Sequence, residues 1–179
     1  ARAVTENVLS IPAIQRCKTV CCYLSMPSGE VHTTALAEGV LRAGKALFVP
    51  KISTNDGSMN FVRLYDSDDL KALRLGLWDI PDPTTEWQGQ RREHRCPNLD
   101  VILVPGVAFD RSFSRLGHGK GYYDRFISAY TQTGRQRPLL IALAFQQQLL
   151  ESGHVPVVEH DWKMDFIVTP EEILASGSS

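Results

Sequence analysis

The chain has 179 residues, a formal net charge of -1 and four cysteines. This length is enough to bury a sizeable core and predicts a single domain. The balanced charge gives no electrostatic reason to expect nucleic acid or a membrane surface as a partner. No apolar run approaches the length of a membrane span, and the first residues lack a signal-peptide pattern. The cysteines lack metal-ligand spacing, which favours a reducing, cytoplasmic compartment.

The first half of the chain alternates between strand-like and helix-like stretches. We predict the end of a helix over residues 3–9, stopped before Pro12, and a buried strand over residues 18–24. A helix over residues 33–44, closed by a glycine, and an apolar strand over residues 46–49 follow. This order predicts a parallel pair of strands joined by a right-handed crossover.

The middle of the chain combines one clear strand with a long polar stretch. Residues 59–64 alternate in hydropathy as a half-buried strand does, and residues 68–74 follow as a short helix with Ser67 as its N-cap. The prolines within residues 77–83 exclude an extended regular element there. Residues 84–98 are mostly polar and charged, which predicts a solvated surface loop.

The second half returns to alternating strands and helices. We predict strands over residues 101–104, 139–145 and 166–168, a helix over residues 122–130 and a short helix over residues 146–150. The whole pattern predicts an α/β layered fold around a largely parallel β-sheet with flanking helices. In such a sheet the ligand crevice lies at the carboxyl ends of the strands. Four residues stand at or just past such ends: Leu24, Pro50, Pro105 and Phe145.

Three glycines at alternate positions mark the loop before the helix that begins at Tyr122. They belong to the run Arg115-Leu116-Gly117-His118-Gly119-Lys120-Gly121. Glycines let backbone N–H groups face an anion, and the start of a helix favours negative charge. Lys120 adds a mobile positive charge and Arg115 a planar one. The run therefore predicts a phosphate cradle.

This run differs from two common phosphate-binding motifs. A Walker A loop needs glycine where Ser114 stands and Ser or Thr where Gly121 stands. The dinucleotide fingerprint needs its third glycine where Tyr122 or Asp124 stands. The alternative interpretation is a flexible surface turn that contains a lysine. The strand before the loop, the helix after it and the acid at the helix start favour the cradle.

Over most of its length the sequence resembles the 5-formyltetrahydrofolate cyclo-ligase family, also called methenyltetrahydrofolate synthetases. The specific part is the block Arg-Leu-Gly-x-Gly-Lys-Gly-Tyr-Tyr-Asp, which ends at Asp124. Weaker blocks support it by their order along the chain: Tyr23-Leu24-Ser25-Met26, Glu30, Phe48-Val49-Pro50-Lys51, Trp78-Asp79-Ile80-Pro81, Pro105 to Asp110, Ala142-Leu143-Ala144-Phe145 and His160-Asp161 to Asp165.

The resemblance implies an ATP- and magnesium-dependent ring closure that converts 5-formyltetrahydrofolate to 5,10-methenyltetrahydrofolate. It implies Lys120 and Arg115 as catalytic residues, since phosphoryl transfer asks mainly for positioning and charge neutralisation. It also implies contacts to the nucleotide from the whole run: Arg115, Leu116, Gly117, His118, Gly119, Lys120, Gly121, Tyr122 and Tyr123. His118 stands where some members of the family have arginine.

The folate and metal contacts are implied in the same way. The folate contacts are Leu24, Glu30, Trp78, His118, Gly119, Lys120, Gly121 and Tyr122, with Trp78 and Tyr122 or Tyr123 stacking on the pterin. Asp124 and Asp161 resemble the family's magnesium ligands. The alternative is structural: core aromatic and aliphatic side chains, a turn glutamate, and acids at a helix start and beside a strand.

Two further expectations concern the chain as a whole. The resemblance implies a basic N-terminal helix whose lysine and arginine side chains bind ATP. We expect residues 1–179 to form one α/β domain without that helix. The expected partners are the reduced folate and ATP alone, with the protein a monomer. The alternative class is a protein of the same fold that binds folate or nucleotide without turnover. A third possibility, a phosphosugar isomerase or an acyl-transfer enzyme, lacks an evident base or nucleophile near the loop.

Overall fold

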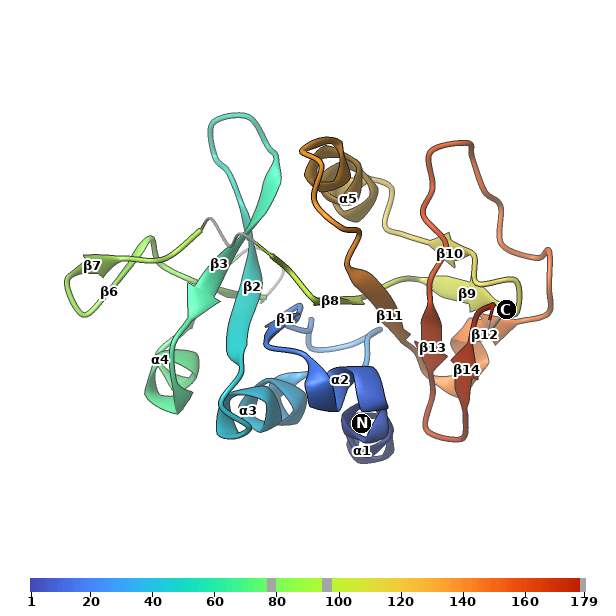
Figure 1. The fold of residues 1–179 in the computed structure, drawn as a ribbon, viewed down its shortest axis with the longest axis horizontal. Coiled ribbons are helices and arrows are strands. Elements are labelled where there is room, and N and C mark those ends of the chain that lie inside the picture. Colours follow the sequence, from blue (N-terminus) through green and yellow to red (C-terminus); the bar gives the residue numbers. More distant parts are fainter. Residues whose placement is uncertain (77–79, 95–97, 178–179) are drawn as a thin grey trace.

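The protein is built around a seven-stranded sheet with the order β14-β13-β11-β8-β1-β2-β3 (Figure 1). A computed structural model describes residues 1–76, 80–94 and 98–177. The strands of this sheet are β1 (Thr19–Cys21), β2 (Ala46–Ile52), β3 (Met59–Leu64), β8 (Val101–Val104), β11 (Leu139–Leu143), β13 (Phe166–Val168) and β14 (Ile173–Ala175).

The interior of this sheet is parallel and its two edges are antiparallel. β1 pairs in parallel with both β2 and β8, so Val20 lies between Leu47 and Val101. β11 continues the parallel set between β8 and β13. β3 and β14 run antiparallel to their neighbours and close the edges. The α/β fold with a largely parallel sheet, predicted from the alternation of elements, is confirmed.

Helices cover both faces of the sheet. α1 (Arg2–Ser10), α2 (Pro12–Arg16) and α3 (Thr34–Arg42) pack on one face, and α5 (Tyr122–Gln132) packs on the other (Figure 1). α3 joins β1 to β2 as the predicted crossover, and it ends before Gly44, whose φ of +77° suits glycine. None of the helices in the described part of the chain is long and apolar enough to cross a bilayer.

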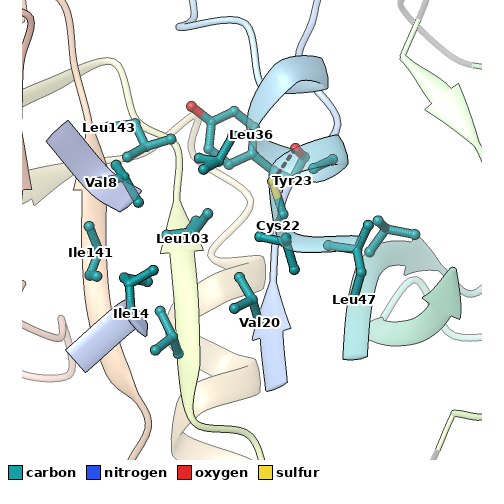
Figure 2. Packing of buried hydrophobic residues seen from close by; sticks show 14 of the residues in the cluster. Val8, Ile14, Val20, Cys22, Tyr23, Leu36, Leu47, Leu103, Ile141 and Leu143 are labelled. Atoms are coloured by element: carbon teal, nitrogen blue, oxygen red, sulfur yellow. Dashed lines mark hydrogen bonds between the residues drawn. The ribbon is translucent and has the colours of Figure 1, made fainter. Parts of the chain in front are cut away.

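Successive residues of β8 divide between two buried clusters, because side chains alternate across a strand. Val101 and Leu103 face the cluster under α1, α2 and α3, and Ile102 and Val104 face the cluster under α5. Figure 2 shows the first cluster, in which Leu103 lies among side chains from the helices and the neighbouring strands. This two-sided burial explains why the strand is apolar without interruption.

Smaller elements flank the main sheet. A three-stranded sheet contains β10 (Arg115–Leu116), β9 (Ala108–Asp110) and β12 (Leu149–Leu150), and the 3-10 helix Gln146–Gln148 precedes β12. Two further pairs are β4 (Arg74–Leu75) with β5 (Pro81–Asp82), and β6 (Glu86–Trp87) with β7 (Gln90–Arg91). Residues 146–150 were predicted to form a short helix, so only their first half follows the prediction.

Several boundaries differ from the sequence prediction. Pro12 starts the second helix α2, because proline is well placed at the first helical position. The N-cap of α4 (Ser67–Lys71) is Asp66, whose Oδ1 accepts a 2.8 Å hydrogen bond from the N–H of Asp69. Of the strand predicted over residues 18–24, only Thr19–Cys21 form β1. One more strand, β14, comes after β13, which was expected to be the last strand.

The charged stretch over residues 84–98 is not wholly a solvated loop. Arg92 is buried and forms a bidentate ion pair with buried Asp69, at 2.6 and 2.7 Å. Its Nε also donates to the carbonyl of Thr84 at 2.7 Å. Since a charge is buried only when it is paired and hydrogen-bonded, this arginine ties the β6–β7 hairpin to α4.

Candidate functional site

The glycine run joins β10 to α5 and adopts a backbone that favours glycine. Gly119 has a φ of +95° and Gly121 a φ of +68°, both in the left-handed region. Gly121 is the N-cap of α5 and provides no side-chain cap to the first turn. The loop therefore leads directly to the N–H groups of an eleven-residue helix, where negative charge is stabilised.

Arg115 lies at the base of the loop and holds three elements together. Its Nε donates to the carbonyl of Pro105 at 2.7 Å, its Nη1 lies 3.5 Å from Oδ2 of Asp124, and its guanidinium covers the ring of Tyr123. A Cβ at Gly117 would come within 3.0 Å of Nη2, so glycine makes room for this arrangement. Burial lowers the pKa of Arg115, and the nearby Asp124 carboxylate opposes that shift.

The two other basic side chains of the loop are exposed. Lys120 is at the surface, and His118 Nε2 lies 3.6 Å from Oε1 of Glu30. Glu30 is buried, and its Oε2 accepts a 3.0 Å hydrogen bond from the N–H of Met26. The structure thus brings Glu30, predicted as a folate contact on the turn after β1, to the glycine run.

Gln148 links three loops at the carboxyl edge of the sheet. Its Nε2 donates to the carbonyls of Gly106 and Val107, at 3.1 and 3.2 Å, and at 3.5 Å to that of Gly29. Its Oε1 accepts from the N–H of Phe145 at 2.8 Å. This glutamine could not be recognised as part of the site from the sequence, because a polar side chain after a strand has no distinctive pattern.

The two predicted metal carboxylates come from segments that meet. Oδ1 of Asp124 accepts a 3.0 Å hydrogen bond from the N–H of Trp162, the residue after Asp161. Oδ2 of Asp161 accepts from the N–H of Val158 at 2.9 Å, and both carboxylates act electrostatically on Arg115. Within the described ranges no group of three or more His, Cys, Asp or Glu side chains could hold a metal ion. Two carboxylates fit magnesium, which keeps several waters and phosphate oxygens as ligands.

The segment from Asp161 to Asp165 is held in place by contacts to residues far from it in the sequence. Trp162 Nε1 donates to Oγ of Ser128 on α5 at 3.0 Å. Lys163 Nζ donates to Oγ of Ser114, the residue before Arg115. Asp165 accepts from Arg137 and from the N–H of Leu140, both at 2.8 Å. These contacts fix the segment of Asp161 against both the glycine run and α5.

The aromatic and aliphatic residues predicted to contact the folate lie in different parts of the structure. Tyr123 is buried in the core, and burial raises its pKa. Tyr122 is half-buried and lines a pocket of about 410 Å³ between α5 and the β2–β3 hairpin. Leu24 lines a different pocket of about 130 Å³, together with Thr33 and Pro81. Trp78 lies outside the described residues.

These features together define a class: an α/β protein with a glycine loop at the N-terminus of a helix and two carboxylates, Asp124 and Asp161, on segments that meet beside it. The family model described as the 5-formyltetrahydrofolate cyclo-ligase family matches residues 1–170. The chain belongs to this family, which confirms the resemblance read from the sequence. It is an enzyme of the cyclo-ligase type.

Individual relatives agree with this assignment. The chain is 34% identical over 179 residues to the probable 5-formyltetrahydrofolate cyclo-ligase of Schizosaccharomyces pombe, covering 96% of this chain and 84% of that protein. It is 34% identical to the mouse cyclo-ligase, covering 92% of this chain and 79% of the mouse protein. The solved 5,10-methenyltetrahydrofolate synthetase of Aquifex aeolicus matches with a TM-score of 0.74 at 30% identity, over 99% of this chain and 82% of that one.

Proposed function

We propose that this protein catalyses the ATP- and magnesium-dependent cyclisation of 5-formyltetrahydrofolate to 5,10-methenyltetrahydrofolate, with ADP and phosphate as the other products. One observation carries the proposal: the positive-φ glycine run opens onto the N-terminus of α5, with exposed Lys120 on it and Asp124 in the first helical turn. Such an arrangement suits a transferring phosphoryl group, because positioning and charge neutralisation supply most of the catalysis.

The proposed reaction has two steps. The formyl oxygen attacks the γ-phosphorus of ATP, so a new P–O bond forms while the bond to the β-phosphate oxygen breaks and ADP leaves. The N10 nitrogen then attacks the activated formyl carbon. The C–O bond breaks, phosphate leaves with the former formyl oxygen, and N10 loses its proton, which leaves the methenyl bridge between N5 and N10.

The residues of the glycine run have distinct parts in this proposal. Lys120 neutralises charge that develops on the phosphoryl oxygens, and the backbone of the run and the helix start hold the phosphates. Arg115 is a positioning residue, because its guanidinium is occupied by Pro105, Asp124 and the ring of Tyr123. Asp124 and Asp161 would hold magnesium, which supplies further charge neutralisation at the phosphates when bound.

The folate side of the site rests on the turn after β1. Glu30 is buried beside His118, and its carboxylate can accept hydrogen bonds from the N–H groups of a reduced pterin. Gln148 holds this turn near the loop after β8 through the carbonyls of Gly29 and Gly106. The folate and the nucleotide would therefore approach the same loop from two sides.

The test is the conversion of 5-formyltetrahydrofolate by the purified chain, followed through the absorbance of the methenyl product. The expected result is product formation that requires both ATP and magnesium and stops when a chelator removes the metal. A chain that binds folate or ATP by calorimetry but forms no methenyl product under these conditions would instead be a binding protein, and the proposal would be wrong.

A further inference from the structure

The side chain of Gln148 ties together the loops that follow three neighbouring strands of the main sheet. β11, β8 and β1 are adjacent and parallel, so their carboxyl ends lie at the same edge. Gln148 follows β11, and its Nε2 donates to the carbonyls of Gly106 and Val107 in the loop after β8. It also reaches the carbonyl of Gly29 in the turn after β1. One amide thus joins segments that are 41 to 119 positions apart in the sequence.

A primary amide matches the groups around this position. Phe145, the N-cap of the 3-10 helix Gln146–Gln148, donates its N–H to the amide oxygen at 2.8 Å. The amide nitrogen has two N–H groups for the carbonyls of Gly106 and Val107, at 3.1 and 3.2 Å, and Gly29 at 3.5 Å is the longest contact. The reverse orientation would place the amide oxygen against these carbonyls, so the surroundings determine which end is which.

The loop after β8 supports the base of the glycine run. The N–H of Val107 donates to the carbonyl of Leu116 at 2.7 Å. Nε of Arg115 donates to the carbonyl of Pro105, also at 2.7 Å. These two acceptor and donor residues of the run form β10, which leads directly to its first glycine. Because Gln148 holds this loop, it also holds the start of the run.

The turn after β1 carries the predicted folate contact Glu30. This residue is buried, and its Oε2 accepts the N–H of Met26 at 3.0 Å, which fixes the carboxylate within the turn. Its Oε1 lies 3.6 Å from Nε2 of His118 in the glycine run. The turn, Gln148, the loop after β8 and the glycine run therefore form a closed ring of contacts.

We propose that Gln148 is a positioning residue that holds the turn of Glu30 and the glycine run at a fixed separation. The inference rests on the proposed function, in which the folate approaches from the turn and the phosphoryl group from the run. Without Gln148 each ligand still has its own contacts, but the formyl oxygen and the phosphorus are no longer aligned. A misplacement of about 1 Å can lower a rate by about 10²-fold. The value of kcat should therefore depend on Gln148 far more than the binding of either ligand does.

The alternative is that Gln148 only caps the short helix, a role that needs the amide oxygen alone. Two substitutions separate these roles. Gln148→Glu has the same shape and keeps an oxygen for the N–H of Phe145, but at neutral pH it cannot donate to the carbonyls. Gln148→Leu removes both kinds of contact. Gln147→Glu is the matched control, because it adds the same charge at the exposed neighbouring position.

The experiment measures kcat and the KM values for ATP and 5-formyltetrahydrofolate through the absorbance of the methenyl product. Hydrogen exchange of the N–H groups of Val107 and Met26, followed by NMR without ligands, reports on the loop and the turn independently of turnover. Circular dichroism and thermal melting check that each variant is folded.

We expect Gln148→Glu and Gln148→Leu to lower kcat by roughly tenfold to a hundredfold, with both KM values within about threefold of those of the original chain. The N–H groups of Val107 and Met26 should exchange faster in both variants. Gln147→Glu should match the original chain in kcat, in both KM values and in exchange.

Two results would overturn the inference in a chain that forms methenyl product. An unaltered kcat in Gln148→Glu would leave Gln148 as a helix cap only, while the proposed function stands. A lowered kcat with unchanged exchange at Val107 and Met26 would show that Gln148 does not act through the two loops. If the original chain forms no product, the proposed function fails and exchange decides alone: faster exchange in the Gln148 variants keeps the tie between the loops, and unchanged exchange rejects it.

Discussion

Among single residues, Lys120 has the most direct part in the proposed chemistry. We predict that Lys120→Ala keeps its fold and thermal stability, because the side chain is exposed and leaves no core cavity. Turnover should fall by a factor on the order of 10²–10³, the usual effect of losing one preorganised charge contact in a transition state. Lys18→Ala is the control in the same absorbance assay, because Lys18 is also exposed and lies just before the amino end of β1. Equal turnover in the two variants would contradict the phosphate cradle.

Asp124 differs from Lys120 because its predicted partner is a metal. Asp124→Asn removes a negative charge while keeping an oxygen that can accept from the N–H of Trp162. The concentration of magnesium that gives half-maximal turnover should rise by roughly tenfold or more, since even outer-shell changes at metal sites typically cost about 10–100-fold. Folate binding without nucleotide, measured by calorimetry, should stay the same. An unaltered magnesium requirement would leave Asp124 with only its structural contacts.

Asp110 carries a stability effect that depends on pH. Burial raises the pKa of this carboxyl, but N–H groups of Val155, Ser114, Ser112 and Gly153 donate to it, and the net pKa is lowered. Because the folded pKa lies below the unfolded value of about 4, the stabilisation is present above pH 4 and is lost as pH falls through the folded pKa.

We therefore predict that Asp110→Asn lowers the free energy of unfolding by about 2 kcal/mol at pH 7, because the amide nitrogen cannot accept the hydrogen bonds that one oxygen now accepts. Denaturation with urea at pH 7 and at pH 3 measures the difference. The gap between the two proteins should narrow at the lower pH. A gap that stays constant or widens would show that Asp110 is not the acid-sensitive group.

Among the elements, the glycine run can be tested by comparing one of its glycines with a glycine of similar positive φ outside the run. Gly119 has a φ of +95° and Gly134, just after α5, a φ of +86°, and a Cβ would meet nothing within 4 Å at either position. Alanine at each should cost stability by about 1–2 kcal/mol through the left-handed conformation alone. Only Gly119→Ala should also lower kcat/KM for ATP. Equal kinetic effects would mean that the conformation of the run has no special part in phosphate binding.

Elements with a strong local pattern could be predicted from the sequence. β3 has the predicted bounds, Met59 to Leu64, because polar and apolar residues are mixed there as in a strand at the edge of a sheet. It is more buried than the predicted half-buried strand, since Met59 and Phe61 pack on one face and Val62 and Leu64 on the other. The strand predicted over residues 166–168 is β13, with the same bounds, because its residues are apolar without interruption. The short strands β4 and β14 could not be predicted, because their pairing depends on a neighbouring segment that no local pattern reveals. The N-cap of α4 was placed one residue late, since Asp66 and Ser67 are both good capping residues.

For the molecule as a whole, the glycine run could be predicted from the sequence, but the tertiary contacts around it could not. The glycine spacing is enough to predict residues 115–121 as a phosphate cradle without any tertiary information. Arg92 pairs with Asp69, and Gln148 binds the carbonyl of Gly106. These residues are at least 23 positions apart in the sequence, so no local pattern predicts their contacts. Likewise Arg115 looks from the sequence like a free cation over phosphate, and only the fold shows that its guanidinium is already occupied.

In the proposed mechanism, the formyl oxygen is phosphorylated at this loop before the ring closes. The most direct measurement follows that oxygen: the chain turns over 5-formyltetrahydrofolate labelled with oxygen-18 in the formyl group, and phosphorus NMR examines the released phosphate. Each phosphate formed should carry one labelled oxygen from the formyl group. Phosphate without the label, with methenyl product formed in equal amount, would contradict this mechanism.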